Sequence, residues 1–581
     1  MSVLSAALPK REFGARFDWT NIWNHWIFLL VCVVVLLPLS FLVLGSFSTA
    51  SLPADFSFDE MGFDNYIEVW TDPGTYQVFY NTFVYTTGAS AIGIVFAAIL
   101  AWLVERTNLP GKIWIYAGVP MTLAMPGLIQ AMAWVLLLSP NSGFVNMGLM
   151  QWLDLEEAPL NIYSLWGMSF VEGLRLVPTA FLMLVPLLRS MDPALEEAAA
   201  VSGANPAATA RKITLGLMVP GIVAVTIYQA MTALEVFEVP GVLGMPVGLH
   251  VFATKIYVAI QAISVLPSYG EANALAMLYL AIGFGAALLY WVVIRRSEKY
   301  AVVTGKGYRP RLTDLGRWRA AFTSFVFLFL FLSIGLPFLV MVYASFVPVL
   351  VQPTWDVFSK LTFEHYEVLF TFPRFGKMFQ NTIFMVTAAA TATTVLSFLI
   401  SMVIVRSRFW GRRALDMLAF IPHAIPGIVS GLALLWLFLI LHVYGSYWTV
   451  AIGFTIAFIA YGTRAMNAAI LQIHKDLEEA ASVSGAPPWR TMWRIFVPLM
   501  MPSFIGLWIW VVLLSIRIAG MPLLLAQGPE NQLLAVMIWN MWDEGLIEEV
   551  GAIATMMILG IFFLVILLRV VGFGRSIIQT R

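Results

Sequence analysis

The chain has 581 residues, of which 60% are hydrophobic and only 11% are charged. Soluble globular proteins are about 45–50% apolar and about 25% charged. This composition therefore excludes an ordinary soluble enzyme, a disordered regulator and a nucleic-acid-binding protein. The 33 basic and 33 acidic residues cancel, so no net positive charge is available for nucleic acid. The composition instead predicts an all-α polytopic membrane protein in a lipid bilayer.

Two sets of six apolar runs are long enough to cross a membrane, because a hydrocarbon core of about 30 Å needs roughly 20 apolar residues per helix. The first set covers residues 26–46, 82–104, 113–139, 162–188, 217–237 and 273–294. The second set covers residues 320–345, 382–404, 417–442, 447–469, 499–523 and 550–568. We expect about 12 transmembrane helices and, within 239–272, one short re-entrant or interfacial helix.

Basic residues gather on one side of the expected membrane. With the N-terminus placed inside, the inner segments hold 26 of the 33 basic residues and 12 acidic residues. The outer segments hold 4 basic and 18 acidic residues. Because Lys and Arg concentrate in the cytoplasmic segments of membrane proteins, both termini are predicted to face the cytoplasm.

An internal repeat divides the chain. Residues 195–204 (LEEAAAVSGA) match residues 477–486 (LEEAASVSGA) at an offset of 282, and the pairs Asn81-Thr82 and Pro126-Gly127 recur 300 residues later. Both copies enter the membrane in the same direction, which predicts parallel repeats. We expect a first six-helix module over 1–297, a basic cytoplasmic linker over 298–317 and a second module over 318–581.

The repeated segments fall in inner loops at about 190–216 and 472–498, between the fourth and fifth spans of each module. Two glutamates, four alanines and two glycines define them: Glu197, Ala198, Ala199 and Gly203, then Glu479, Ala480, Ala481 and Gly485. The pattern resembles the EAA loop of binding-protein-dependent ABC importer permeases. It departs from the family pattern at Gly216, where the family has Pro, and at Val497, where it has Leu.

This resemblance implies a type I ABC importer permease in the bacterial inner membrane. Its expected partners are two copies of an ATPase subunit, which bind ATP and Mg²⁺, and a substrate-binding protein on the outer side. We expect the chain itself to hold no catalytic residue, cofactor or metal, and its best match to an ATP-binding P-loop, at 305–307, lacks required residues. Each EAA segment is expected to form a two- or three-turn helix that starts near Pro193 or Asp476. Gly203 and Gly485 are expected to let the chain turn where a Cβ would clash.

Ionisable residues inside a membrane are costly and mark functional sites. Glu235 and Arg517 occupy equivalent positions, five residues before a proline in each fifth span. In the proteins that this chain resembles, the fifth spans line the translocation path. We hypothesise that Glu235 and Arg517 line this path and pair across the repeat axis, with Glu238 as a second acid; the alternative is a purely structural ion pair, or a position of both residues in the outer interface. Glu172 and Arg175 are expected to neutralise each other.

Fusion of both halves in one chain, with the segment 139–146 (SPNSGFVN), is most similar to the ferric-iron permeases. Ferric iron is therefore the preferred cargo; polyamine, thiamine, phosphonate or another small organic ion is the alternative. No cluster of Tyr, His and carboxylate residues that would bind iron is visible in the sequence. An ion-gradient-driven secondary transporter would leave the doubled EAA loop unexplained, and a membrane enzyme would need a catalytic constellation that the sequence lacks.

Overall fold

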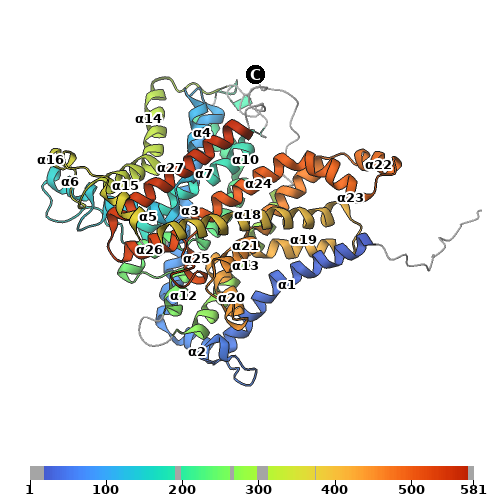
Figure 1. Cartoon of the computed structure of the whole chain (residues 1–581). Helices are drawn as coiled ribbons and strands as arrows, with labels where there is room; N and C mark the ends of the chain where they lie inside the picture. Colours follow the sequence, from blue (N-terminus) through green and yellow to red (C-terminus); the bar gives the residue numbers. More distant parts are fainter. Residues whose placement is uncertain are drawn as a thin grey trace, which may run out of the picture.

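The computed structural model describes residues 19–189, 191, 198–199, 201–203, 205–261, 267–297, 312–372 and 374–572. Within these ranges the regular secondary structure is helical, and the only extended pairings are three isolated β-bridges (Figure 1). Ten helices are long and apolar enough to cross a membrane, or up to thirteen spans are present if each of three bent helix pairs is one span. The prediction of about 12 transmembrane helices is confirmed.

The helices of the first half follow one another with short connections. They are α1 (Trp19–Phe47), α2 (Asp64–Thr71), α3 (Pro73–Arg106), α4 (Lys112–Met121), α5 (Gly127–Leu138), α6 (Phe144–Leu153), α7 (Leu165–Arg189), α9 (Pro206–Thr209), α10 (Leu215–Glu235), α11 (Glu238–Leu243), α12 (Phe252–Ile260) and α13 (Tyr269–Ser297).

The second half repeats this order. Its helices are α14 (Arg319–Leu330), α15 (Leu336–Phe346), α16 (Trp355–Phe358), α17 (Glu364–Thr371), α18 (Phe375–Arg406), α19 (Arg412–Phe420), α20 (Gly427–Ile440), α21 (Tyr447–Gln472), α22 (Asp476–Val483), α23 (Pro488–Thr491), α24 (Val497–Arg517), α25 (Gly520–Leu525), α26 (Leu534–Asp543) and α27 (Ile547–Gly572). A π-helical segment, Phe331–Gly335, joins α14 to α15.

The third span of each half breaks at the repeated Pro-Gly pair. Segments Lys112–Ala124 and Gly127–Leu138 meet at 94°, and segments Arg412–Ala424 and Gly427–Ile440 meet at 107°. The residues before the two prolines are extended, with ψ of 121° at Met125 and 119° at Ile425. Proline disfavours the helical conformation of the residue before it, so the repeated motif encodes a repeated bend.

The repeated Asn-Thr pair anchors a loop and caps a helix in each half. The side-chain amide of Asn81 donates to the His250 carbonyl, and the amide of Asn381 donates to the Glu530 and Gln532 carbonyls. The hydroxyls of the neighbouring threonines accept the first backbone N–H groups of α12 and α26, from Phe252 at 3.1 Å and Leu534 at 3.0 Å. A helix leaves its first N–H groups unpaired, so each threonine satisfies one of them.

The re-entrant helix expected within 239–272 is a bent pair, because Glu238–Val247 and Phe252–Ile260 meet at 71°. Helices α25 and α26 follow the same order in the second half.

The two halves are interlocked through their first spans. Helix α1 packs against α13 of its own half and against α19 and α20 of the other half. Helix α15 likewise packs against α27 of its own half and against α5 of the first. One hydrophobic cluster of buried residues extends through both halves. Each module therefore buries part of its apolar surface only in the presence of the other.

The end of the linker is tied to the first module. Most of the linker predicted over 298–317 lies outside the described residues, but the N–H of Thr313 donates to the Arg106 carbonyl at 2.8 Å, and the Asn108 side-chain amide donates to Asp314 at 2.7 Å. Hydrogen bonds from the Gly316 N–H and from Asn108 lower the pKa of the exposed Asp314 carboxyl. The charged form of Asp314 therefore favours this contact.

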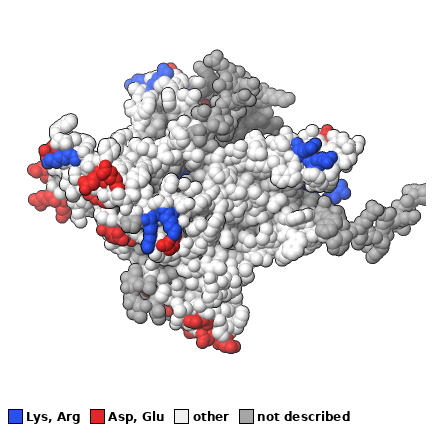
Figure 2. All heavy atoms as spheres, viewed as in Figure 1, with Lys and Arg blue, Asp and Glu red and all other residues white. Residues whose placement is uncertain are grey.

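Charged side chains occupy the margins of the molecule. Figure 2 shows acidic residues near α2, α6 and α16, with some basic residues among them, and basic residues near α14 and α22, with a broad uncharged surface in between. Figure 1 places α22 and α23 at the opposite end of the molecule from α6 and α16. An uncharged band between charged ends is the surface expected of a protein that spans a bilayer.

Candidate functional site

A polar cavity of about 260 Å³ lies between the two halves. Helices α7, α10 and α11 line it from the first half, and the segments around α20, α21, α24 and α25 line it from the second. Ten polar side chains face it: Glu172, Arg175, Thr179, Tyr228, Thr232, Glu235, Glu238, His423, Tyr461 and Arg517. The three predicted path residues, Glu235, Glu238 and Arg517, are thus brought to one cavity.

Two equivalent helix breaks position the charged side chains. Helix α10 ends at Glu235 and α24 ends at Arg517, and each is followed by an extended residue, Val236 with ψ of 127° or Ile518 with ψ of 124°. A helix C-terminus carries partial negative charge, which favours Arg517 and disfavours an ionised Glu235. Glu235 and Arg517 therefore occupy equivalent positions in the repeat, but the helix end stabilises the charge of Arg517 and destabilises that of Glu235.

A quartet of charges occupies one part of the cavity, with Glu172 and Glu238 buried and Arg175 and Arg517 half-buried. Arg175 Nη1 lies 3.0 Å from Glu172 Oε2 on the same face of α7, so the predicted neutralisation of these two residues is confirmed. Glu238 Oε1 accepts the backbone N–H of Ala519 at 2.8 Å, across the boundary between the halves. Arg517 interacts electrostatically with Arg175, Glu238 and Glu172. The quartet of two acids and two arginines is formally neutral.

The hypothesised pair between Glu235 and Arg517 is not formed in this conformation. Among the described residues neither side chain takes part in an ion pair or a side-chain hydrogen bond. In the part of the chain that the structure describes, Glu235 has no ion-pair or hydrogen-bond partner, whereas Glu238 has the backbone N–H of Ala519.

Three further polar residues close to Glu235 were not singled out from the sequence. Tyr228 of α10 and Tyr461 of α21 bring their hydroxyl oxygens to 2.9 Å, which joins the two halves directly. The His423 ring packs against both phenol rings, with ring centroids 5.1 Å from Tyr461 and 6.0 Å from Tyr228. These residues come from segments more than 30 residues apart, so no local spacing marks them.

Arg464, another arginine within a span, has a structural role. Its Nη1 lies 3.0 Å from Asp416 Oδ1, and its guanidinium lies over the Phe420 ring. It does not line the polar cavity.

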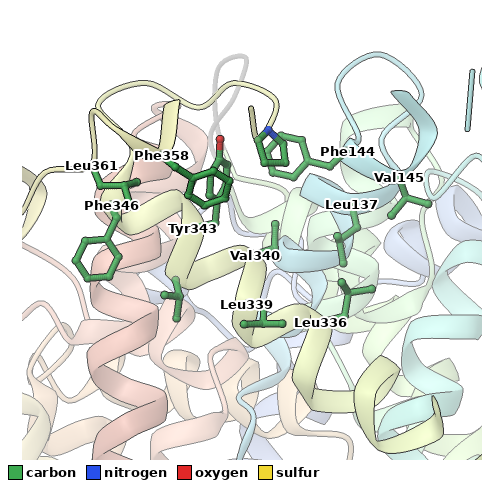
Figure 3. A pocket seen from close by; sticks show the side chains of 12 residues that line it. Leu137, Phe144, Val145, Leu336, Leu339, Val340, Tyr343, Phe346, Phe358 and Leu361 are labelled. Atoms are coloured by element: carbon green, nitrogen blue, oxygen red, sulfur yellow. The ribbon is translucent and has the colours of Figure 1, made fainter. Parts of the chain in front are cut away.

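A larger cavity, of about 500 Å³, lies between α5–α6 and α15–α16. Figure 3 shows leucine, valine and aromatic side chains, among them Leu137, Phe144, Leu339 and Phe358, converging on it. Its one hydroxyl group, on Tyr343, already donates to the Val351 carbonyl at 2.8 Å. A site without an available polar group offers no means to orient an ion, so the functional site is placed in the polar cavity.

The second EAA segment forms a short exposed helix. Helix α22 begins at Asp476, as predicted, and its first turn carries three acids, which complement the helix dipole. No residue of α22 is buried, and Glu479, Ala480 and Ala481 all lie on it. The helix ends at Val483, and two residues further on the N–H of Gly485 donates to the Ser482 carbonyl.

The two EAA glycines let the chain turn, as expected, but no neighbouring atom causes the expected clash. A Cβ added at Gly203 or Gly485 would meet nothing within 4 Å, so no clash demands a glycine. Both residues instead have positive φ, +84° and +74°, in the left-handed region that side chains with a Cβ rarely adopt. In the first loop Ala198 and Ala199 are helical, whereas Glu197, Asp192 and Pro193 lie outside the described residues.

A repeated arginine anchors the loops that contain the EAA segments. Arg106, at the end of α3, donates to the Leu188 carbonyl at 2.9 Å, and Arg406, at the end of α18, donates to the Ile470 carbonyl at 3.1 Å. Arg406 Nε also lies 3.0 Å from Glu478 Oε1 on α22. The two arginines are 300 residues apart and their acceptors, Leu188 and Ile470, are 282 residues apart, which are the offsets of the repeat. The repeat could therefore have predicted these anchors from the sequence.

Residues 394–578 match the family described as "Binding-protein-dependent transport system inner membrane component". The chain is 26% identical over 442 residues to a putative ferric transport system permease protein of Haemophilus influenzae, covering 72% of this chain and 64% of that protein. It is also 26% identical over 432 residues to a ferric transport system permease protein of Actinobacillus pleuropneumoniae, covering 72% and 59%. The alignments thus span less than two thirds of both relatives.

A solved structure of a bacterial alginate ABC transporter, in complex with an alginate pentasaccharide-bound periplasmic protein, has a TM-score of 0.39 and 22% identity. It covers 49% of this chain and 97% of the matched chain.

Residues 394–578 thus carry the family domain, and the two-fold repeat gives the first half an equivalent segment, so the chain is similar to the permease components of binding-protein-dependent ABC importers. It has the organisation of a fused double permease and resembles the ferric transport permeases.

Proposed function

We propose that the chain is the membrane-spanning subunit of an ATP-driven importer that moves ferric iron by alternating access. The observation that carries the proposal is the doubled EAA segment, one copy in each half, each ending at a glycine of positive φ and each held by an arginine at the end of the second span. Two matched segments at equivalent positions suit two identical ATPase subunits.

Docking of ATPase subunits is supported by the exposure of apolar side chains around both segments. Val483 is 90% exposed, Val201 is 89% exposed, and the nearby Trp489 is also largely exposed. Exposed apolar groups next to charged ones are common at protein–protein interfaces. ATP and Mg²⁺ bind to the partner subunits, and ATPase closure brings the two EAA segments together.

The polar cavity is assigned to the translocation path. It lies between the halves, where relative motion of the modules would open it, and it contains the path candidates Glu235, Glu238 and Arg517. The substrate-binding protein docks at the opposite end from α22, where the acidic residues gather, so both termini face the cytoplasm of the bacterial cell.

Ferric iron as cargo is supported by the names of the relatives and by the fused organisation. Polyamine, thiamine, phosphonate or another small organic ion is the alternative cargo, because selectivity in such systems lies largely with the binding protein. An ion-gradient-driven carrier is the alternative mechanism.

The test is a Glu479→Ala variant, combined with Glu197→Ala, in the permease reconstituted with its ATPase and binding protein. We expect ATPase stimulation by the loaded binding protein and ⁵⁵Fe uptake both to fall at least tenfold, while the ATPase alone is unchanged. Glu544→Ala, an exposed acid at the other end of the molecule, is the matched control. Normal uptake in the double variant, together with uptake abolished by an ionophore, would contradict the proposal and favour a gradient-driven carrier.

A further inference from the structure

The cavity contains a compact group of oxygen and nitrogen donors that the charged quartet does not include. Tyr228 and Tyr461 share a hydrogen bond of 2.9 Å, and His423 packs on both rings. Glu235 follows Tyr228 by seven residues on α10, nearly two helical turns, so both side chains lie on the same face of the helix. Glu235 also interacts electrostatically with both tyrosines.

The oxygen and nitrogen atoms of this group have lone pairs that no hydrogen bond in the described residues uses. A phenol oxygen that shares one hydrogen bond retains a further lone pair. In the described part of the chain, no hydrogen bond is made by either ring nitrogen of His423, and no ion pair by Glu235.

The charge of this set selects for a cation. The quartet is neutral, so the whole cavity carries the formal charge of Glu235 alone. An isolated carboxylate in a low-dielectric region is costly unless a cation or a proton neutralises it. A hard, highly charged metal ion prefers oxygen donors, and phenolate, carboxylate and imidazole together satisfy Fe³⁺, whose binding would displace the phenol protons. Among the described residues no three His, Cys, Asp or Glu side chains group as metal ligands, so the phenols are essential to the set.

We propose that Tyr228, His423 and Tyr461, with Glu235 next along α10, form a transit site at which the permease itself binds ferric iron between the two halves. The proposal rests on the proposed function, because it takes ferric iron as the cargo. The cavity of about 260 Å³ has room for the ion and several water molecules, since a water molecule occupies about 30 Å³ in the liquid. Because the donors come from both halves, separation of the modules would take the site apart and release the ion.

The experiment uses the full chain in lipid nanodiscs, titrated with ferric nitrilotriacetate. Iron bound by a phenolate absorbs visible light through charge transfer, and this absorbance is the direct readout. We expect the band in the wild-type chain, its loss in the Tyr228→Phe/Tyr461→Phe double variant, and at least tenfold weaker binding in Glu235→Gln. Tyr290→Phe is the matched control, because Tyr290 packs against Tyr228 but does not line the cavity.

Tyrosine-to-phenylalanine changes keep the rings, and thermal unfolding of each variant confirms that the fold is retained. A band that is absent from the wild type, or unchanged in the double variant, would overturn the transit site. Wild-type ⁵⁵Fe uptake by the assembled transporter without a Tyr-dependent band would overturn the transit site alone and leave the proposed function standing. Uptake of another solute in place of iron would overturn the proposed cargo and the transit site together.

Discussion

Glu238 belongs to the first half of the molecule, but its side chain accepts a hydrogen bond from the backbone of the second half. Its counterpart in the repeat is Gly520, so no second acid occupies the equivalent place. A Cβ at Gly520 would lie 3.2 Å from Phe237 Cβ, which explains the small residue there. The Glu238 carboxylate instead reaches across to the N–H of Ala519, the residue before α25. The sequence predicted an acid near the path but not its backbone partner.

Loss of the Glu238 carboxylate should destabilise the break between α24 and α25. In Glu238→Ala the buried N–H of Ala519 loses its acceptor, and an unsatisfied buried donor costs about 1–3 kcal/mol. Glu238→Gln keeps a carbonyl acceptor and serves as the control. Thermal unfolding of the purified chain in detergent measures the difference, and we expect a lower midpoint for the alanine variant. Equal midpoints would show that this hydrogen bond contributes nothing to stability.

Close helix pairs depend on single glycines rather than on repeated motifs. Helices α3 and α7 approach so closely that a Cβ on Gly173 would lie 2.7 Å from Ile92 Cβ and 3.1 Å from the Ala89 carbonyl. Small residues allow such approach between membrane helices. The corresponding position of the second half is Thr455, so the repeat does not carry this contact. Its location follows from tertiary packing, whereas the bends at Pro126 and Pro426 follow from the local sequence.

Gly173→Ala should therefore separate α3 from α7. Overpacking of a well-filled interface costs about 1–3 kcal/mol, because both backbones must shift. Gly285→Ala, at a site on α13 where a Cβ would meet nothing within 4 Å, is the control. The midpoint of thermal unfolding should fall for Gly173→Ala and stay the same or rise for Gly285→Ala. An unchanged midpoint of thermal unfolding in Gly173→Ala would contradict the close packing of α3 and α7.

At the scale of the whole molecule, the first spans hold the two modules together. Helix α1 lies on α19 and α20, and α15 lies on α5, so each module covers apolar surface of the other. The hydrogen bonds of Thr313 and Asp314 add a polar contact at the linker end. The contribution of Asp314 is complete above its ordinary pKa and is lost as the pH falls through its lowered pKa.

The two halves should therefore assemble without a covalent link. When residues 1–297 and 312–581 are expressed together as separate chains, affinity purification of one half should recover the other in equal amount. The buried interface, including α1 on α20, supplies the apolar contacts for this association. A tagged second half expressed with residues 50–297, which lack α1, is the matched comparison and should recover less partner. Equal recovery with and without α1 would show that the packing of α1 on the second half does not hold the two modules together.

Local composition and the repeat were enough to predict the spans, the bends and the EAA loops. Apolar runs define the spans because lipid offers no hydrogen bonds to the backbone. Pro126 and Pro426 define the bends, and the EAA segments carry the resemblance to ABC importer permeases. Only the tertiary structure decided which residues meet. Tyr228, His423 and Tyr461 come together, and Arg517 and Glu235 line the same cavity without pairing, because contacts between distant helices depend on packing that no local pattern records.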